Sequence, residues 1–362
     1  MHSTYLPLSL KTVLVAAFAL LFAGCSKPKE TTQGASPEAK PGPEAAAATK
    51  VKLIGSGASF PAPIYDRWFK EFTKQDGLIT VDYQSVGSGQ GVKSFIEGHT
   101  DFGASDAAMS DEEIKKAKDN VLLLPMTAGS IVLAYNLEGV DGLKLSRDAY
   151  TGIFLGSVKT WNDPKIAAAN PGVKLPATPI ALVHRSDGSG TTYVFTQHLA
   201  AINEAWKTKP GVGKSIEWPT GVGAKGNEGV AAQIKQTPGS IGYIEFAYGV
   251  LMKQPMAELE NKAGKYVKPT LESAAASLGA VELPADMRAW VTDPEGDASY
   301  PIVTYTWILA KQKYDDPAKA AALKKVLSWS LTEGQKLSSS LNYVPLPEGV
   351  VTKVQSAVTK IN

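Results

Sequence analysis

The chain has 362 residues, of which 37 are Lys or Arg and 35 are Asp or Glu, so its net charge is only +2. This near balance argues against a general affinity for nucleic acid or for an anionic membrane surface, so an anion site in this chain has to be local. The single cysteine excludes a disulfide within the sequence, and stability therefore depends on a packed core, for which the length allows two domains.

Residues 1–24 are predicted to be a lipoprotein signal peptide. The stretch 13–22 is apolar, follows a weakly basic start, and is too short to span a membrane as a helix. Two small residues then precede Cys25, at the place where bacterial lipoprotein signals have the cysteine that is lipidated. The segment resembles a lipobox, with Phe22 where that pattern usually has an aliphatic residue. The alternative is an ordinary cleaved signal in which Cys25 has no role.

The segment 25–50 is predicted to be a lipidated cysteine followed by a disordered tether. Residues 26–50 contain Lys, Glu, Pro, Ala and Gly but no aromatic or large aliphatic side chain that could bury surface. A lipid-anchored tether keeps a folded domain near a membrane and leaves it free to reorient. We therefore expect a location outside the cytoplasm, in the periplasm or at the cell surface, and a partner in the membrane.

The first folded element is expected to be a strand at 51–54, followed by the Gly-rich segment 55–63 and a helix with one apolar face. The loop presents the Ser59 hydroxyl and the Phe60 backbone N–H at the start of that helix. Unpaired amides at a helix start favour an anion. The alternative is a Gly-rich connection that close packing requires.

The same order of strand, Gly-rich turn and helix is predicted again at 80–86, 87–91 and 92–97, with Ser88 in the turn. The turn resembles a phosphate-binding loop. However, the Gly-Lys-Ser/Thr triplet of nucleotide-binding P-loops does not follow at the required spacing, so nucleotide hydrolysis is disfavoured.

Asp106 lies where a short predicted strand meets a turn, just before a helix that the pattern Ser110 to Glu113 is expected to cap. Asp106 could itself be an N-cap residue. Alternatively, its carboxylate could accept a hydrogen bond from an anion that carries a proton. This geometry would prefer hydrogen phosphate to sulfate, because sulfate has no proton to donate near neutral pH.

Two apolar strand candidates, 122–125 and 130–136, are expected to flank a crossing between domains. Near the C-terminus, the apolar strand 302–309 and two helices are expected to return to the first domain.

The segment 185–191 lies between an apolar strand pattern and a helical pattern. The Arg185 guanidinium, the Ser189 and Thr191 hydroxyls and the first amides of the helix could converge on one tetrahedral anion. Asp187 could hold the guanidinium by a further hydrogen bond. For Ser189, the alternative is a turn in which it only caps the helix. For Arg185 and Asp187, the alternative is an exposed ion pair that contributes little to stability.

Four motifs, at 55–63, 87–93, 101–106 and 185–191, together closely resemble the phosphate-binding proteins of bacterial phosphate-specific ABC transporters, the PstS family. The similarity extends over nearly the whole exported domain. It implies an α/β fold, the two-lobed periplasmic binding protein of type II, in which each lobe is a mixed sheet flanked by helices and the ligand cleft lies between the lobes.

The resemblance also implies the lobe boundaries and the ligand shell. Residues 51–127 and 303–362 would form lobe 1, and residues 128–302 would form lobe 2. The expected phosphate ligands are Ser59, the Phe60 amide, Ser88, Asp106, Arg185, Ser189, the Gly190 amide and Thr191. Ser59 stands where the family often has Thr, and Asp187 is expected to support Arg185. No metal and no cofactor are expected.

The resemblance implies high-affinity binding of inorganic phosphate outside the cytoplasm and its delivery to the membrane permease of an ABC importer. We expect a monomer, anchored to a membrane through a lipid on Cys25, that neither acts as an enzyme nor binds nucleic acid.

Three alternatives stay open at this point. The chain could bind another oxyanion, such as sulfate, molybdate or phosphonate, or it could be a surface protein for phosphate sensing or adhesion. A serine hydrolase or a phosphoryl-transfer enzyme with Ser189 as nucleophile is less compatible, because such an enzyme needs a base beside the serine. None of the histidines lies in the four motifs; they are His2, His99, His184 and His198.

Overall fold

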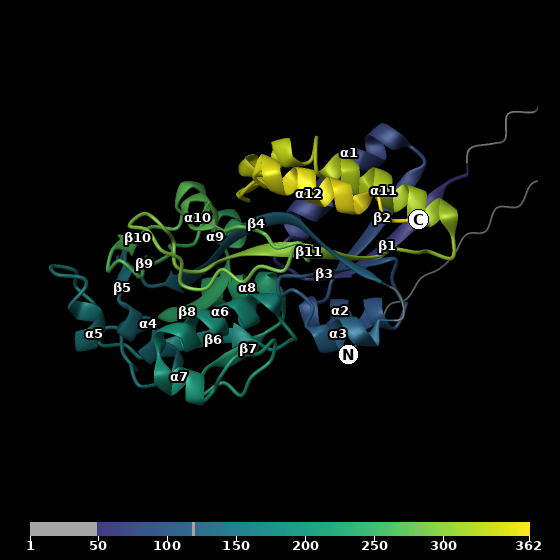
Figure 1. The fold of residues 1–362 in the computed structure, drawn as a ribbon. Coiled ribbons are helices and arrows are strands. Elements are labelled where there is room, and N and C mark those ends of the chain that lie inside the picture. The colour runs from purple at the N-terminus through teal and green to yellow at the C-terminus, as the bar shows by residue number, and fades with distance from the viewer. Residues whose placement is uncertain (1–48, 118–119, 280) are drawn as a thin grey trace, which may run out of the picture. The chain divides into compact units, whose positions relative to one another are not determined.

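The computed structural model describes residues 49–117, 120–279 and 281–362 (Figure 1). The predicted signal peptide, Cys25 and nearly all of the predicted tether lie outside the described residues. No helix in the described ranges is long and apolar enough to cross a membrane.

Most strands of the described chain join one mixed sheet. The strands are β1 (Val51–Gly57), β2 (Ile79–Ser85), β3 (Phe102–Ser105), β4 (Val121–Asn136), β5 (Lys144–Leu145), β6 (Ala181–Arg185), β7 (Val222–Ala224), β8 (Ser240–Glu245), β9 (Glu258–Glu260), β10 (Tyr266–Val267) and β11 (Val303–Lys311). Eight of these form a sheet in the order β2-β1-β3-β11-β4-β8-β6-β7, and a small second sheet has the order β10-β9-β5.

Helices connect and cover these strands. The α-helices are α1 (Ala62–Asp76), α2 (Ser88–Ile96), α3 (Asp111–Lys116), α4 (Arg147–Phe154), α5 (Pro164–Ala167), α6 (Gly190–Ile202), α7 (Glu204–Thr208), α8 (Gly226–Gln236), α9 (Phe246–Leu251), α10 (Leu271–Leu278), α11 (Pro317–Ser330) and α12 (Glu348–Val358), and the short 3-10 helices are η1 (Gln335–Leu337) and η2 (Ser339–Leu341).

Parallel pairing places the Gly-rich loops at the carboxyl ends of strands. Strand β1 pairs in parallel with β2 and β3, and β6 pairs in parallel with β7 and β8. Helices connect most of these strands, so α1, α2, α6 and α8 all begin at this end. In sheets of this kind, ligands bind outside the carboxyl ends of the strands.

The long strand β4 joins the two groups of parallel strands. Its residues 121–130 pair with β11 and its residues 131–136 pair with β8, both antiparallel. The sequence predicted two separate strands here, and that was wrong, because Pro125 lies inside one continuous strand. The register between β4 and β11 shifts at Thr306 and Trp307, beside Pro125, and such an irregularity is where a sheet can accommodate a proline without an N–H.

Figure 1 shows α1, α11 and α12 on one face of the strands β1, β2 and β11, and α2 and α3 on the opposite face. The buried side of α1 includes Ile64, Trp68 and Phe72, as their helical spacing predicts. The Trp68 indole donates to the Gly334 carbonyl at 2.7 Å, so the first helix is attached to the C-terminal segment. Around β6 and β8, α8 packs against the strands.

Two helices begin earlier than the sequence pattern indicates. Helix α2 starts at Ser88 rather than Val92, and α6 starts at Gly190, inside the segment 185–191 that was expected to precede the helix. Glycines lower the apparent helical signal in both first turns, because glycine is a poor helix former. The hydroxyl of Ser88 and the amide of Gly190 therefore belong to the ends of helices rather than to long loops.

Candidate functional site

Loops from distant parts of the chain meet around Asp106, at the carboxyl ends of the strands. The Asp106 N–H donates to Ser88 Oγ at 3.2 Å, and the Thr191 hydroxyl donates to Asp106 Oδ2 at 3.3 Å. Gly190 lies so close that a Cβ there would come within 2.6 Å of Ser88 Oγ and 2.8 Å of the Asp106 nitrogen. Only a glycine allows this approach, so Gly190 is required by the contact between the two loops.

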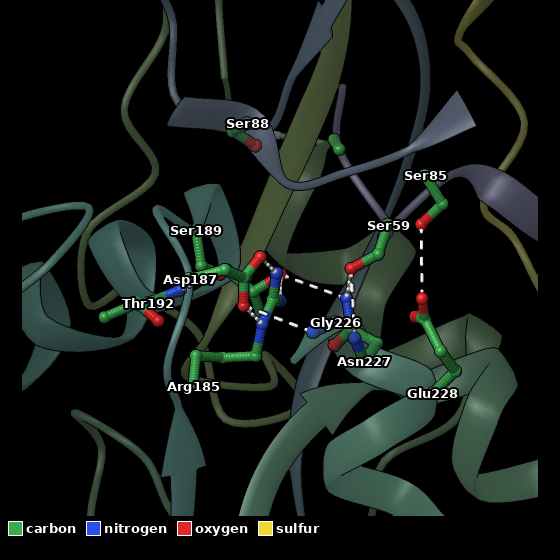
Figure 2. Close-up of polar contacts among 12 residues, drawn as sticks. Ser59, Ser85, Ser88, Arg185, Asp187, Ser189, Thr192, Gly226, Asn227 and Glu228 are labelled. Carbon is green, nitrogen blue, oxygen red and sulfur yellow. Dashed lines mark hydrogen bonds and ion pairs between the residues drawn. The ribbon is translucent and has the colours of Figure 1, made fainter. Parts of the chain in front are cut away.

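The Arg185 side chain is buried at the end of β6, with 1% of its surface exposed. Its Nε and Nη2 donate to the two carboxylate oxygens of Asp187 at 2.7 and 2.6 Å, and the Gly226 N–H donates to Asp187 Oδ1 at 3.1 Å (Figure 2). Burial acts to raise the pKa of Asp187, but the hydrogen bonds and charge of Arg185 outweigh it, so the pKa is lowered. The pair is therefore ionised and fixed, in contrast to the alternative of an exposed ion pair.

One nitrogen of Arg185 stays available on the side of Thr191. Arg185 Nη1 is 3.4 Å from Thr191 Oγ1, a long contact, and it makes no bond to Asp187. The guanidinium therefore directs part of its donor set and its positive charge toward the Asp106 side of the site.

The Asp106 carboxyl is 1% exposed and is surrounded by hydroxyl groups. Thr306 donates to its Oδ1 at 3.0 Å, and Ser88 and Thr191 donate to its Oδ2 at 3.4 and 3.3 Å. Burial raises the pKa of Asp106 from 3.8 to about 7, although the Thr306 bond and the Arg185 charge act in the opposite direction. A carboxyl with this pKa can exist with or without its proton near neutral pH.

Asp106 does not cap a helix, so that alternative is wrong. Helix α3 has Ser110 as its N-cap, and the Ser110 and Glu113 side chains form the capping box that the sequence predicted. Because Ser110 already satisfies the helix end, Asp106 is free to serve the site.

The amides of Phe60, Gly190 and Thr191 have no acceptor within the described residues. All three residues are buried. A buried N–H without a partner is costly, so amides of this kind are donors that a bound anion can satisfy. Gly190 and Thr191 are the first two residues of α6, where the helix dipole also favours negative charge.

Asn227 connects the two sides of the site, and it is not among the site residues that the sequence predicted. Ser59 Oγ accepts hydrogen bonds from the Asn227 backbone N–H at 3.0 Å and from its Nδ2 at 2.9 Å (Figure 2). Asn227 Nδ2 also lies 3.2 Å from Thr191 Oγ1, and its Oδ1 accepts from the Glu245 N–H at 2.9 Å. The only signal in the sequence was the pair Gly226-Asn227, a glycine followed by a small polar residue, as at the other helix starts of the site.

Thr306 was missed for a different reason. It lies on the apolar strand β11, whose pattern indicated only a buried element. Thr304 and Thr306 share one face of that strand, and Thr304 donates to the Asp106 carbonyl at 3.3 Å. Two threonines spaced by two in an apolar strand are the signal that could have located this face.

Ser189 has one role that the sequence left open. Its Oγ accepts from the Thr192 N–H at 3.0 Å, so Ser189 caps α6. The cap uses the oxygen as an acceptor, and the hydroxyl proton is still available for donation to an anion.

No histidine of the described chain contacts Ser189. His184 stacks on Trp218 with ring centres 4.9 Å apart. His198 Nε2 lies 2.8 Å from the Tyr150 hydroxyl, and burial lowers the pKa of His198 to about 3. His99 is exposed, near Glu97.

A known family and a curated relative match most of the chain. The family model of a PBP superfamily domain matches residues 42–333. The phosphate-binding protein PstS of Pasteurella multocida is 43% identical over 308 residues, which cover 84% of this chain and 89% of that protein. The chain belongs to the PstS family.

Solved structures agree with the PstS fold. A high affinity periplasmic phosphate-binding protein, PfluDING, bound with phosphate, has a TM-score of 0.71 at 21% identity over 84% of this chain and 93% of that chain. A putative phosphate ABC transporter substrate-binding protein from Clostridium perfringens with bound phosphate has a TM-score of 0.62 at 16% identity over 82% of this chain and all of that chain. The predicted fold class, a two-lobed α/β periplasmic binding protein, is confirmed.

The ligands expected from the PstS motifs all lie in the described part of the chain. Direct hydrogen bonds or close contacts link Ser88, Asp106, Arg185, Gly190 and Thr191, and Asn227 joins Ser59 to Thr191. Phe60 contributes an unpaired amide, and Ser189 contributes the helix cap. Their roles as phosphate ligands stay a prediction.

Proposed function

We propose that this PstS-family protein binds inorganic phosphate outside the cytoplasm and delivers it to the membrane permease of an ABC importer. The observation that carries the proposal is that hydrogen-bond donors and a carboxylate acceptor are buried side by side around Asp106. Arg185, the hydroxyls and the unpaired amides supply donors and positive charge, whereas Asp106 supplies an acceptor. That combination suits an anion that carries a proton.

Asp106 is the feature that favours hydrogen phosphate over sulfate. A fully ionised oxyanion next to an ionised Asp106 leaves two negative oxygens in contact, and burial makes that repulsion costly. Hydrogen phosphate donates its proton to the carboxylate instead. The relatives that carry the name phosphate-binding protein PstS support the same ligand.

The number of donors is sufficient for tight binding. Hydrogen bonds to a charged group contribute about 1.5 to 3 kcal/mol each. Roughly five net favourable bonds would offset the cost of association and still give micromolar affinity or better.

The proposed lobes are residues 51–127 with 303–362, and residues 128–302. Ser59, Ser88 and Asp106 belong to the first lobe, and Arg185 to Thr191 belong to the second. The Gly89 N–H donates to the Gly188 carbonyl at 2.8 Å across this division. Contacts of this kind form only when the lobes are together, so phosphate favours the closed form by adding bonds to both sides.

The membrane anchor is part of the same proposal. A lipid on Cys25 and a tether up to residue 50 would hold the binding protein near its permease as a monomer. Labelling of the expressed full chain with a radioactive fatty acid, compared with Cys25→Ala, tests this. Equal label in both chains would contradict lipidation at Cys25.

Isothermal titration of the purified protein with phosphate, arsenate and sulfate tests the function. We expect saturable phosphate binding, loss of most affinity in Arg185→Ala and, at about pH 8.5 where Asp106 is ionised, no heat from sulfate at large excess. Tight sulfate binding would overturn the assignment of phosphate and would favour another oxyanion.

Catalysis by Ser189 lacks support from its surroundings. Ser189 Oγ is bonded to a backbone N–H and has neither a histidine nor a carboxylate partner among the described residues. Incubation with phosphate esters is the test. Turnover that disappears in Ser189→Ala would revive the enzyme alternative.

A further inference from the structure

Three tyrosine hydroxyls bind three consecutive carbonyl groups of the loop after β1. The pairs are Tyr83 with Ala58 and Tyr343 with Phe60, both at 2.6 Å, and Tyr248 with Ser59 at 2.7 Å. These bonds fix the peptide planes of a loop whose glycine-rich sequence is flexible.

Tyr248 differs from the other two tyrosines in the proposed lobe to which it belongs. Tyr83 lies on β2 and Tyr343 follows η2, so both belong to the same proposed lobe as the loop. Tyr248 lies in α9, which follows β8 in the other proposed lobe. Its bond to Ser59 therefore crosses from one lobe to the other.

The bond made by Tyr248 sets the direction of a donor. In a trans peptide the C=O and the following N–H point in opposite directions. The peptide between Ser59 and Phe60 is trans, since the cis peptide bond found in the described residues precedes Pro210. Tyr248 and the Ala62 N–H hold the Ser59 carbonyl on one side, so the Phe60 N–H points to the opposite side.

The Phe60 N–H is one of the amides without an acceptor in the described chain. Asn227 binds Ser59 Oγ from the same lobe as Tyr248, so both oxygen atoms of Ser59 are held from across the division. Tyr248 is 8% exposed, and it lies in the first turn of α9, where Glu245 caps the helix through the Ala247 N–H. Burial raises the pKa of Tyr248 well above its usual range, so the hydroxyl keeps its proton.

We propose that Tyr248 is a positioning residue that aims the Phe60 amide at the bound anion, and that it does so only when the two lobes are closed. The inference rests on the proposed function and deepens it. In an open form the Ser59 carbonyl keeps only the long bond from the Ala62 N–H at 3.2 Å and loses Tyr248, so the Phe60 amide is held less firmly. Lobe closure therefore completes the donor set, which couples closure to the strength of binding.

Tyr248→Phe and Tyr343→Phe form a matched pair for the test. Each removes one buried hydroxyl that donates to a carbonyl, and each keeps the ring and its packing. The carbonyl bound by Tyr343 belongs to a peptide whose nitrogen is that of Pro61, which has no N–H to aim. A general loss of loop rigidity would affect both variants, whereas loss of the Phe60 donor would affect Tyr248→Phe alone.

The experiment measures inorganic phosphate binding by titration and by stopped-flow kinetics. We expect Tyr248→Phe to bind phosphate about tenfold more weakly, with faster release and an unchanged association rate, because the bond exists only after closure. Tyr343→Phe should stay within about twofold of the parent chain. Without phosphate, the two variants should unfold at similar temperatures.

The outcomes separate the two proposals. If the parent chain does not bind phosphate, the proposed function fails and the role of Tyr248 fails with it. If the parent chain binds and Tyr248→Phe binds equally well, only the role of Tyr248 is overturned. Equal weakening in Tyr343→Phe, or a change confined to the association rate, also overturns it.

Discussion

The Arg185 guanidinium is held by the Asp187 carboxylate through two hydrogen bonds, from Nε at 2.7 Å and from Nη2 at 2.6 Å. This pairing leaves Nη1 for the site and prevents the side chain from rotating away. The carboxylate is the more exposed partner, with 11% of its side-chain surface accessible against 1% for the guanidinium. Asp187 therefore orients the charge of Arg185 from the rim of the site.

The first prediction concerns this pair. Arg185→Ala removes the buried positive charge and should lower phosphate affinity by at least about a hundredfold, since bonds to charged groups contribute about 1.5 to 3 kcal/mol each. Asp187→Ala keeps the charge but frees its position, so a loss of about tenfold is expected. Titration calorimetry measures both. If Asp187→Ala bound phosphate as tightly as the parent chain, the guanidinium would need no support.

The second prediction concerns selectivity at Asp106. An amide can donate to a fully ionised oxyanion, so Asp106→Asn should bind sulfate while its phosphate affinity falls only modestly. The parent chain should also begin to bind sulfate at about pH 5.5, where a carboxyl with a pKa of about 7 is mostly protonated. Competition titrations at low and high pH give the ratio of the two affinities. An unchanged ratio in Asp106→Asn would contradict the role of the carboxylate.

The third prediction is a pH dependence of stability without ligand. The pKa of Asp106 rises from 3.8 to about 7 on folding, so the folded chain binds more protons between these values. The stability that the protonated carboxyl contributes is fully present below 3.8 and is lost as the pH rises through about 7.

Asp106→Asn has no such proton to lose. The melting temperature of the parent chain should therefore fall relative to that of Asp106→Asn as the pH rises from about 5 to about 8. Titrating groups far from Asp106 are present in both chains and cancel in the difference, whereas the pKa of buried Glu245 is raised mainly by burial and to a smaller extent by the Asp106 charge. A difference in melting temperature that stays constant with pH, or that changes in the opposite direction, would show that folding does not raise the pKa of Asp106.

The positions of Ser59, Ser88, Arg185 and Gly190 could be predicted because local sequence determines them. Each lies where a strand ends and a helix begins, and the glycines and small polar residues that build such a turn lie next to one another in the chain. The same locality explains why the capping box at α3 was found.

The remaining site residues depend on contacts between distant segments. Thr306 donates to a carboxylate 200 positions away, and Asn227 reaches Ser59 across 168 positions. Neither residue lies in a pattern that differs from an ordinary strand or helix start. The continuous strand β4 was missed for a related reason, since the irregular pairing with β11 that accommodates Pro125 is a property of two strands together.

The fourth prediction tests Asn227 against a matched residue. Asn227→Ala should weaken phosphate binding by about tenfold, because it releases the Thr191 hydroxyl and leaves Ser59 Oγ with only the backbone N–H of residue 227. Asn170 is also a buried amide with several bonds, to Lys144 and Ile166, but it contacts none of the site residues. Asn170→Ala should lower the melting temperature and leave phosphate affinity unchanged. Equal affinity losses in both variants would reduce Asn227 to a general role in stability.

The last prediction concerns two ion pairs between the proposed lobes. Both acidic partners lie in the first turn of α3, where Glu113 pairs with Lys214 at 2.6 Å and Asp111 pairs with Arg288 at 2.6 Å. The Lys214 carbonyl also accepts the Ser189 N–H at 2.8 Å, so the first pair lies beside the site. Opening of the lobes would break these pairs, and they should therefore slow phosphate release.

Lys214→Met should increase the release rate of phosphate about two- to fivefold at low salt, and the difference should shrink at high salt because partly exposed charges are screened. The matched control is Lys262→Met, which removes an exposed pair with Glu295 within a single lobe. Stopped-flow measurements at two ionic strengths separate the two variants. A release rate in Lys214→Met that matches the control at low salt would mean that the pair does not resist opening.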